Sequence, residues 1–270
     1  MTDVISALSR GASKERNCIL EAQGMRKDFG GVVAVQDLDF QLGQGMINAI
    51  IGPNGAGKTT IFNLVTGVYP LTSGHILFKG QRIDGKKAWD IAALGIVRTF
   101  QNLQIFGNMS VVENVMVGRH CRTRSNIISA AFSLPGARAE DDRIYARAME
   151  ELEKVGLAER ALDRASSLPF GQQRLLELVR ALAVDPALLL LDEPAAGLAG
   201  QETERLGALI RSIRDSGVTV LLVEHDMELV MGVADWVIVL DYGRKISEGT
   251  PADVQNDERV IAAYLGEEVD

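Results

Sequence analysis

The chain has 270 residues, of which 47% are hydrophobic and 24% are charged, a composition typical of a globular protein with a buried core. Its formal net charge of −8 gives no electrostatic reason to bind nucleic acid or an anionic membrane surface. The two cysteines are far apart and the three histidines lack a ligand spacing, so the sequence predicts neither a disulfide framework nor a metal site built from them.

Residues 1–16 lack the apolar stretch of a signal peptide, and we interpret them as a flexible polar leader. No apolar run approaches the length that crosses a bilayer. We therefore expect the chain in the cytosol, with any role at a membrane arising through partner subunits.

Residues 35–42 show partial alternation of apolar and polar side chains, which favours a half-buried antiparallel strand. The apolar run 46–51 ends in a glycine-rich turn, after which residues 59–65 favour a helix. This succession of strand, loop and helix is the setting in which a phosphate-binding loop occurs.

The turn at residues 52–59 reads GPNGAGKT and matches the pattern G-x-x-x-x-G-K-[ST]. Its glycines allow backbone N–H groups to surround phosphate oxygens, Lys58 neutralises the β and γ phosphates, and the Thr59 hydroxyl ligates Mg²⁺. A chance glycine loop is the alternative, and the flanking strand and helix argue against it. We predict that the nucleotide is bound by Gly52, Pro53, Asn54, Gly55, Ala56, Gly57, Lys58, Thr59 and Thr60.

The middle of the chain differs from the rest because helix formers dominate and no buried strand is expected. Residues 101–167 are interpreted as a helical subdomain inserted into an α/β core. One face of a helix within it carries Ile144, Ala148, Leu152 and Val155. The apolar segment 126–137 predicts core packing, with a docking surface as the alternative.

Apolar runs at 187–191 and 218–223 predict two further strands of a parallel sheet that is covered on both faces. Between them, residues 201–215 have the apolar spacing of an amphipathic crossover helix. Residues 236–240 and the following RKISEG predict a strand and a closing hairpin. We therefore expect an α/β core from 17–100 and 168–250, and a helical tail from 251–270.

Polar residues follow several of these strands, and parallel sheets gather such residues at the carboxyl ends of their strands. Asp192 is placed to hold Mg²⁺ directly or through water, and Glu193 to polarise the attacking water. Gln101 is placed to reach the metal or the water, and His225 the γ-phosphate. The alternatives are a strand end turning into solvent and ordinary hydrogen-bonding loop residues.

Together these residues resemble the ATP-binding subunit of an ABC transporter over residues 20–266. The resemblance implies an α/β P-loop NTPase fold with a RecA-like core, an antiparallel β subdomain and an inserted α-helical subdomain. It also implies ATP and Mg²⁺ as ligands and catalytic roles for Glu193, His225 and Lys58. Phe29 corresponds to the family's adenine-stacking ring, Gln101 to its Q-loop glutamine and Asp192 to its Walker B aspartate. The resemblance further implies that Thr59, Gln101 and Asp192 are the ligands of the metal.

The segment LPFGQ at residues 168–172 resembles the family's signature motif, which is usually LSGGQ and ends the helical subdomain. In the family it closes over the nucleotide of a second subunit, so Gly171 and Gln172 are expected to contact that nucleotide. Pro169 removes a hydroxyl and an N–H, a loss of about 1.5–3 kcal/mol for one charge-assisted hydrogen bond. The helix that follows is predicted to have one apolar stripe, formed by Leu175, Leu178, Val179 and Leu182.

The stretches DEPAAGL, VEHDMELVMG and VIAAYLGEE look like the subunit that serves branched-chain amino acid uptake, with urea, amides or other amino acids as alternatives. The resemblance implies a second identical or homologous ATPase subunit, transmembrane permease subunits, an indirect extracytoplasmic solute-binding partner, and a place at the cytoplasmic membrane face. A nucleic-acid-directed ABC ATPase is less favoured because only one cassette and no heptad run are present. A GTPase is disfavoured because the sequence lacks an N-K-x-D motif.

Overall fold

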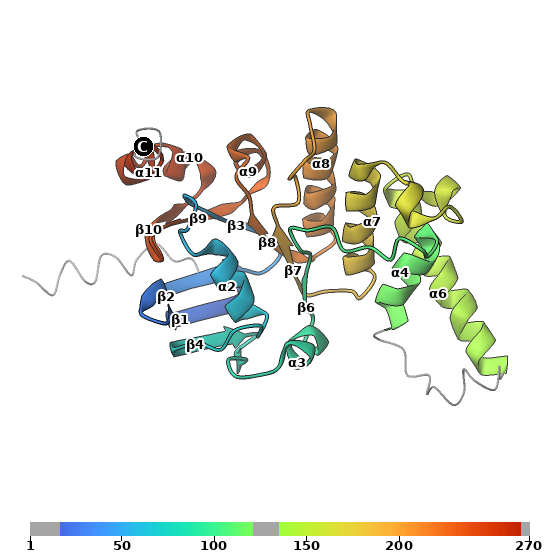
Figure 1. The fold of residues 1–270 in the computed structure, drawn as a ribbon, viewed down its shortest axis with the longest axis horizontal. Helices are drawn as coiled ribbons and strands as arrows, with labels where there is room; N and C mark the ends of the chain where they lie inside the picture. The colour runs from blue at the N-terminus through green and yellow to red at the C-terminus, as the bar shows by residue number, and fades with distance from the viewer. Residues whose placement is uncertain (1–16, 121–134, 266–270) are drawn as a thin grey trace, which may run out of the picture.

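The computed structural model describes residues 17–120 and 135–265 (Figure 1). Segments 1–16, 121–134 and 266–270, including most of the apolar segment considered above, lie outside the described residues. Of the part described, no helix is long and apolar enough to cross a membrane.

A four-stranded antiparallel sheet has the order β2-β1-β4-β5 in the described chain. It confirms the antiparallel strand expected at residues 35–42, which is the inner part of a longer strand. The four strands are β1 (Cys18–Phe29), β2 (Val32–Gly43), β4 (Ser73–Phe78) and β5 (Gln81–Arg82).

Within residues 17–120 and 135–265, the second sheet has six strands in the order β10-β9-β3-β8-β7-β6, and only the edge strand β10 runs antiparallel to its neighbour. The edge strand β6 is short, because only residues 96–98 pair with β7. The strands are β3 (Ile47–Ile51), β6 (Ile96–Arg98), β7 (Leu188–Asp192), β8 (Thr219–Val223), β9 (Trp236–Asp241) and β10 (Arg244–Gly249).

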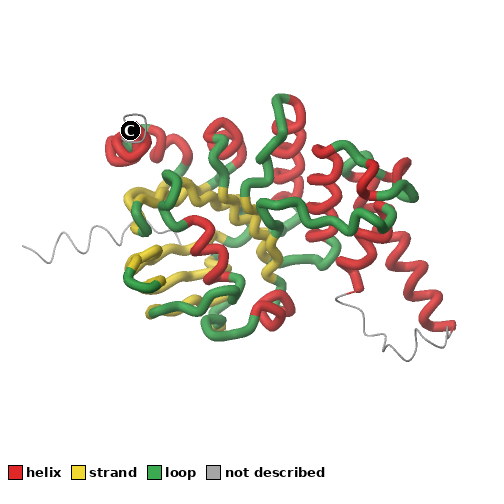
Figure 2. Tube along the Cα trace, in the orientation of Figure 1, coloured by secondary structure: helices red, strands yellow, loops and turns green. Residues whose placement is uncertain are grey.

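Helices lie on the six-stranded sheet and extend to one side of it (Figures 1 and 2). The crossover helix expected over 201–215 is present with those bounds. The α-helices are α2 (Lys58–Val65), α3 (Ala88–Ala93), α4 (Val111–His120), α6 (Pro135–Lys154), α7 (Phe170–Leu182), α8 (Gln201–Asp215), α9 (Met227–Val233), α10 (Pro251–Gln255) and α11 (Glu258–Leu265). Short 3₁₀ turns are η1 (Ala158–Arg160) and η2 (Ala165–Ser167).

The central sheet separates two hydrophobic clusters, which explains why its strands are apolar throughout. Leu188 and Leu190 of β7 pack toward the antiparallel sheet and α2, whereas Leu189 and Leu191 pack toward α8 and α9. Since successive side chains of a strand point to opposite faces, both sets are buried. The prediction of a doubly covered parallel sheet is confirmed.

A third cluster is formed by α4, α6 and α7. Ile144, Ala148 and Leu152 of α6 are buried as expected, whereas Val155, just past the end of the helix, is only half-buried. Gly156, in the turn that follows, has a φ of 72°. The described residues of 101–167 contain no strand, only a bridge between Ser110 and Arg164.

The single apolar stripe predicted for α7 is wrong. Leu178 and Val179 are buried, but Leu175 and Leu182 are only half-buried, and Leu176 is fully buried in their place. The reason is that α7 is covered on two sides, with Leu178 in the α/β core and Leu176 in the helical cluster. The predicted boundary between the core and the helical subdomain, at 167/168, lies just before α7. This helix packs against both parts of the chain.

Gly118 sets how closely α4 approaches α7. A Cβ on Gly118 would lie 2.4 Å from the Arg180 carbonyl oxygen, so we expect Gly118→Ala to lower the free energy of unfolding by about 1–3 kcal/mol. Gly232, in α9, has nothing within 4 Å of such an atom, and Gly232→Ala should raise it by up to about 1 kcal/mol through helix propensity. Urea unfolding measures the free energy of unfolding of both variants. If Gly118→Ala is stabilised as much as Gly232→Ala, the close packing of α4 against α7 is contradicted.

Candidate functional site

The glycine-rich loop after β3 is held tightly by neighbouring backbone. Gly52 has a φ of 151°, and a Cβ there would lie 2.1 Å from the Leu240 carbonyl oxygen. Gly57 has a φ of 99°, and a Cβ there would lie 2.6 Å from the Ala34 carbonyl oxygen. Only glycine fits both positions without displacement of the backbone of β9 and β2.

Lys58 lies inside the curl of this loop. Its side chain is buried, and Nζ donates to the carbonyl oxygens of Pro53, at 2.8 Å, and Gly52. Gly57 caps α2 without a side-chain hydrogen bond, which leaves the first N–H groups of that helix suited to an anion. Asn54 and Thr59 are exposed, and Thr60 is half-buried.

The strand ends bring the other predicted side chains together. Strands β3, β8, β7 and β6 are neighbours in that order, so the loops that follow them share one edge of the sheet. The carboxylate of Glu193, just past β7, is the meeting point. Its Oε2 accepts from Gln101 Nε2 at 2.7 Å, and its Oε1 lies 2.6 Å from His225 Nε2.

The backbone of Glu193 is unusual, because its φ of 48° is in the left-handed region that non-glycine residues seldom adopt. Its N–H donates to the Val223 carbonyl oxygen at 2.8 Å, which holds this conformation against β8. Strained backbone of this kind clusters at functional sites. Nothing in the residue type indicated it.

Asp192 is buried and paired with an arginine that sequence reasoning missed. Its Oδ2 accepts from Arg98 Nη2 at 2.7 Å, and the two side chains are 4% and 7% exposed. Arg98 ends β6 and its partner ends β7, so the pair is formed by sheet pairing and no local pattern indicates it.

Glu224 is a second residue that sequence reasoning missed. It is buried, its Oε1 accepts from the Ala195 N–H at 2.6 Å, and its Oε2 accepts from the His225 N–H at 3.0 Å. Burial raises the pKa of the Glu224 carboxyl above its ordinary value, against the effect of these hydrogen bonds. Glu224 thus fixes the segment after Glu193 relative to His225, and its place at a strand end beside His225 was the available signal.

Phe29 lies at the end of β1 and is 40% exposed. Its ring is 5.2 Å from that of Tyr69, edge to face, and Lys27 Nζ lies 4.8 Å from its centroid. The ring therefore belongs to a small exposed aromatic group formed by the end of β1 and the segment between α2 and β4. Tyr69 was not anticipated.

The signature segment makes its contacts away from its own phosphate loop. Pro169 is the N-cap of α7, and a Cβ on Gly171 would lie 2.3 Å from Oε1 of Glu202 in α8. Gln172 accepts from Arg160 Nη1 at 3.0 Å. The structure thus does not bring Gly171 and Gln172 to the group around Glu193.

A buried ion pair in α7 fixes the segment that carries Gln101. Arg174 donates to the carbonyl oxygens of Phe100 and Gln101, at 3.2 and 2.5 Å, and pairs with Glu177 at 3.2 Å. Glu177 in turn accepts from the Gln104 N–H at 3.1 Å. Burial raises the pKa of the Glu177 carboxyl, while the Gln104 N–H and Arg174 oppose the shift.

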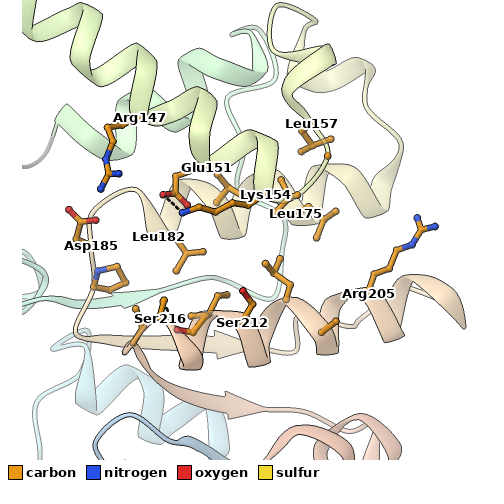
Figure 3. A pocket seen from close by; sticks show the side chains of 18 of the residues that line it. Arg147, Glu151, Lys154, Leu157, Leu175, Leu182, Asp185, Arg205, Ser212 and Ser216 are labelled. Carbon is orange, nitrogen blue, oxygen red and sulfur yellow. Dashed lines mark hydrogen bonds and ion pairs between the residues drawn. The ribbon is translucent and has the colours of Figure 1, made fainter.

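A cavity of about 1110 Å³ lies between α6, α7 and α8, with the Glu151–Lys154 ion pair at its side (Figure 3). Its lining mixes leucines with charged side chains such as Arg147 and Arg205. Gln172 is the one predicted nucleotide-binding residue in that lining. The candidate site is therefore located by the strand ends and not by this cavity.

Comparison with known proteins agrees with this geometry. A sequence model of the ABC transporter family matches residues 35–196, and one of branched-chain amino acid ATP-binding cassette transporters matches residues 244–270. The chain belongs to the ABC transporter ATP-binding proteins. As a member of this family the cassette binds ATP, and its hydrolysis of ATP is coupled to transport.

Two relatives cover nearly the whole cassette. LivG, a high-affinity branched-chain amino acid transport ATP-binding protein of Escherichia coli, is 42% identical over 92% of this chain and 98% of its own length. BraF, the corresponding protein of Pseudomonas aeruginosa, is 43% identical over the same shares.

Two solved structures of ABC transporter cassettes share the fold. One, in its ADP conformation, has a TM-score of 0.80 and 30% identity, covering 92% of this chain and 99% of the other. A nucleotide-free cassette has a TM-score of 0.79 and 29% identity, covering 92% and 98%. The predicted P-loop fold with antiparallel and helical subdomains is confirmed.

The Arg174–Glu177 pair can be tested by a double-mutant cycle. Removing either partner leaves a buried charge unpaired, so Arg174→Met and Glu177→Leu should each lower the free energy of unfolding by about 3–5 kcal/mol, and the double variant by less than the sum. Arg147 and Glu150 of α6 form a pair with the same spacing but are each 55% exposed, and their coupling should stay below about 0.5 kcal/mol. Equal coupling in the two cycles would contradict the buried link.

Proposed function

We propose that this cassette drives the uptake of branched-chain amino acids. The observation that carries the proposal is the identity of 42–43% to LivG and BraF over nearly their full lengths. The match of residues 244–270 to branched-chain amino acid cassettes is a second support at the end of the chain. The chain itself does not touch the solute, which the permease and a solute-binding protein outside the cytoplasm select.

In this proposal the phosphate loop and Lys58 hold the phosphates of ATP, and Phe29 stacks on its adenine. Thr59, Asp192 and Gln101 supply a hydroxyl, a carboxylate and an amide oxygen, which are the hard donors that Mg²⁺ prefers. Among the described residues no group of three or more His, Cys, Asp or Glu side chains forms a metal site. The metal would therefore depend on the phosphates of the nucleotide for much of its coordination.

Glu193 is the proposed general base that orients the attacking water. Its carboxylate is the group toward which Gln101 and His225 both point, and its strained backbone fixes its direction. Gln101 and His225 would exchange this carboxylate for the metal and the γ-phosphate.

Two cassettes, identical or homologous, are proposed to close around two ATP molecules. Glu202 lies beside Gly171 and Arg160 bonds Gln172, and neither neighbour belongs to the group around Glu193, which supports a role for the signature outside its own site. Small size at Gly171 allows the phosphate of a partner's ATP to approach the start of α7. Residues 196–199 read AGLA and occupy the position of the family's D-loop, the segment that follows the Walker B strand, but lack the aspartate that many members carry there for a contact across the dimer.

The permease is proposed to dock where the Q-loop segment joins the helical part. Three large apolar side chains are exposed there, namely Phe100 and Phe106, each 48% exposed, and Met109 at 37%. Exposed apolar side chains gathered on one segment are typical of an interaction surface. Docking there would place the cassette at the cytoplasmic face of the membrane.

Glu193→Gln is expected to accumulate as an ATP-bound dimer, because the carboxylate that orients water is lost while the phosphate loop is intact. Size-exclusion chromatography with ATP measures it. Adding Gly171→Asp should return the chain to a monomer that still binds ATP, and Lys58→Ala should remove binding itself. Persistence of the dimer in the Gly171→Asp background would contradict the trans role of the signature.

The solute assignment is tested by reconstitution with the permease subunits that co-purify from detergent-solubilised membranes. Proteoliposomes with the matching solute-binding protein should accumulate leucine, isoleucine or valine with ATP, and lose accumulation with Lys58→Ala. ATP-driven uptake of urea or an amide, with none of leucine, would overturn the assignment and leave the ATPase function standing.

A further inference from the structure

The guanidinium of Arg98 joins three elements beneath the phosphate loop. Nη2 donates to Asp192 at the end of β7, and Nη1 donates to Asn63 Oδ1 in α2 at 2.6 Å. The same group lies over the rings of Phe62 and Phe100, at 5.4 and 5.2 Å from their centroids. Its Nε is buried without a hydrogen-bond partner.

This arrangement gives Asp192 a permanent positive charge as its partner. The pair is almost fully buried, where charges are poorly screened. A carboxylate that already carries a cation is a poorer ligand for a second one, because the two cations repel each other.

We propose that Arg98 is a resident counter-ion of Asp192 that competes with Mg²⁺ and so sets the Mg²⁺ requirement of ATP binding. The inference rests on the proposed role of Asp192 toward the metal. Arg98 is in this view a positioning residue, since it acts on the metal through Asp192.

Asn63 provides the reason why Arg98 can release Asp192. A guanidinium has five N–H donors, and here the Asn63 oxygen and two aromatic faces retain it when the carboxylate turns to the metal. Asn63 lies in α2, the helix that begins at Lys58, so the exchange occurs beside the phosphate loop. Asn63 and Asp192 thus share one guanidinium, and weakening one partner should strengthen the hold on the other.

A purely structural role for Arg98 makes a different prediction. If the arginine only supported the fold, Arg98→Met and Asn63→Ala would both disturb Asp192 and shift Mg²⁺ dependence in the same direction. Competition predicts opposite directions, because the first variant removes the competing cation and the second leaves it with Asp192 as its main partner.

The experiment is a Mg²⁺ titration of the binding of a fluorescent ATP analogue to the full chain, starting from EDTA. Arg98→Met should lower the Mg²⁺ concentration for half-maximal effect by about three- to ten-fold, and Asn63→Ala should raise it by at least about two-fold. Arg98→Lys keeps the charge and should remain within about two-fold of the unaltered chain. Arg119→Met, which removes an arginine from the more exposed pair with Asp185, is the matched control and should change nothing.

Thermal unfolding without nucleotide checks that each variant folds, and if Arg98→Met does not, the Asn63→Ala and Arg98→Lys titrations still decide. An unchanged or raised Mg²⁺ requirement in Arg98→Met, or a lowered one in Asn63→Ala, overturns the inference. Asp192→Asn separates the two proposals. If this variant has the same Mg²⁺ dependence as the unaltered chain, Asp192 does not bind the metal, and the proposed metal role of Asp192 is wrong whatever Arg98 does.

Discussion

The parallel pairing of β7 with β8, from Leu188 opposite Thr219 to Asp192 opposite Val223, is the constraint on which the candidate site depends. It places Glu193 directly beside the end of β8, where the Val223 carbonyl accepts the Glu193 N–H. The register follows from leucines and valines that bury both faces of the sheet. A slip of one residue would exchange the two buried faces and carry the carboxylates away from the phosphate loop. The same register that buries the apolar side chains therefore also places the polar groups of the site.

Buried charges extend this constraint into the helical part. Arg174 and Glu177 bind backbone groups of the Q-loop segment and stand on the helix that begins with the signature. A buried ion pair contributes little net stability compared with apolar residues of similar size, but removal of one partner is strongly destabilising because the other charge is left buried and unpaired. It therefore selects one arrangement of the two segments. In the proposed pair of cassettes, these bonds would couple movement of Gln101 to movement of α7.

Sequence patterns predicted what depends on neighbours along the chain, and missed what depends on neighbours in space. The phosphate loop and the bounds of α8 follow from local spacing, and both were anticipated. Arg98 and Glu224 were missed because their partners, Asp192 and Ala195, are fixed only by sheet pairing. The α7 stripe was wrong for a related reason, since a helix covered on two sides has no single apolar face. The left-handed backbone of Glu193 carries no sequence signal, because strain at one residue is held by a distant hydrogen bond.

The functional groups share a feature that bears on how the cassette cycles. Each has a partner inside the chain, since Lys58 bonds loop carbonyls, Asp192 bonds Arg98, and Glu193 bonds Gln101 and His225. Binding of a nucleotide with its metal thus exchanges existing interactions for new ones, so that only the difference between them favours the bound form. In the proposed dimer, a small difference would let ATP binding close the two cassettes and hydrolysis release them. Internal partners such as Arg98 would then help to make the binding of nucleotide and metal reversible.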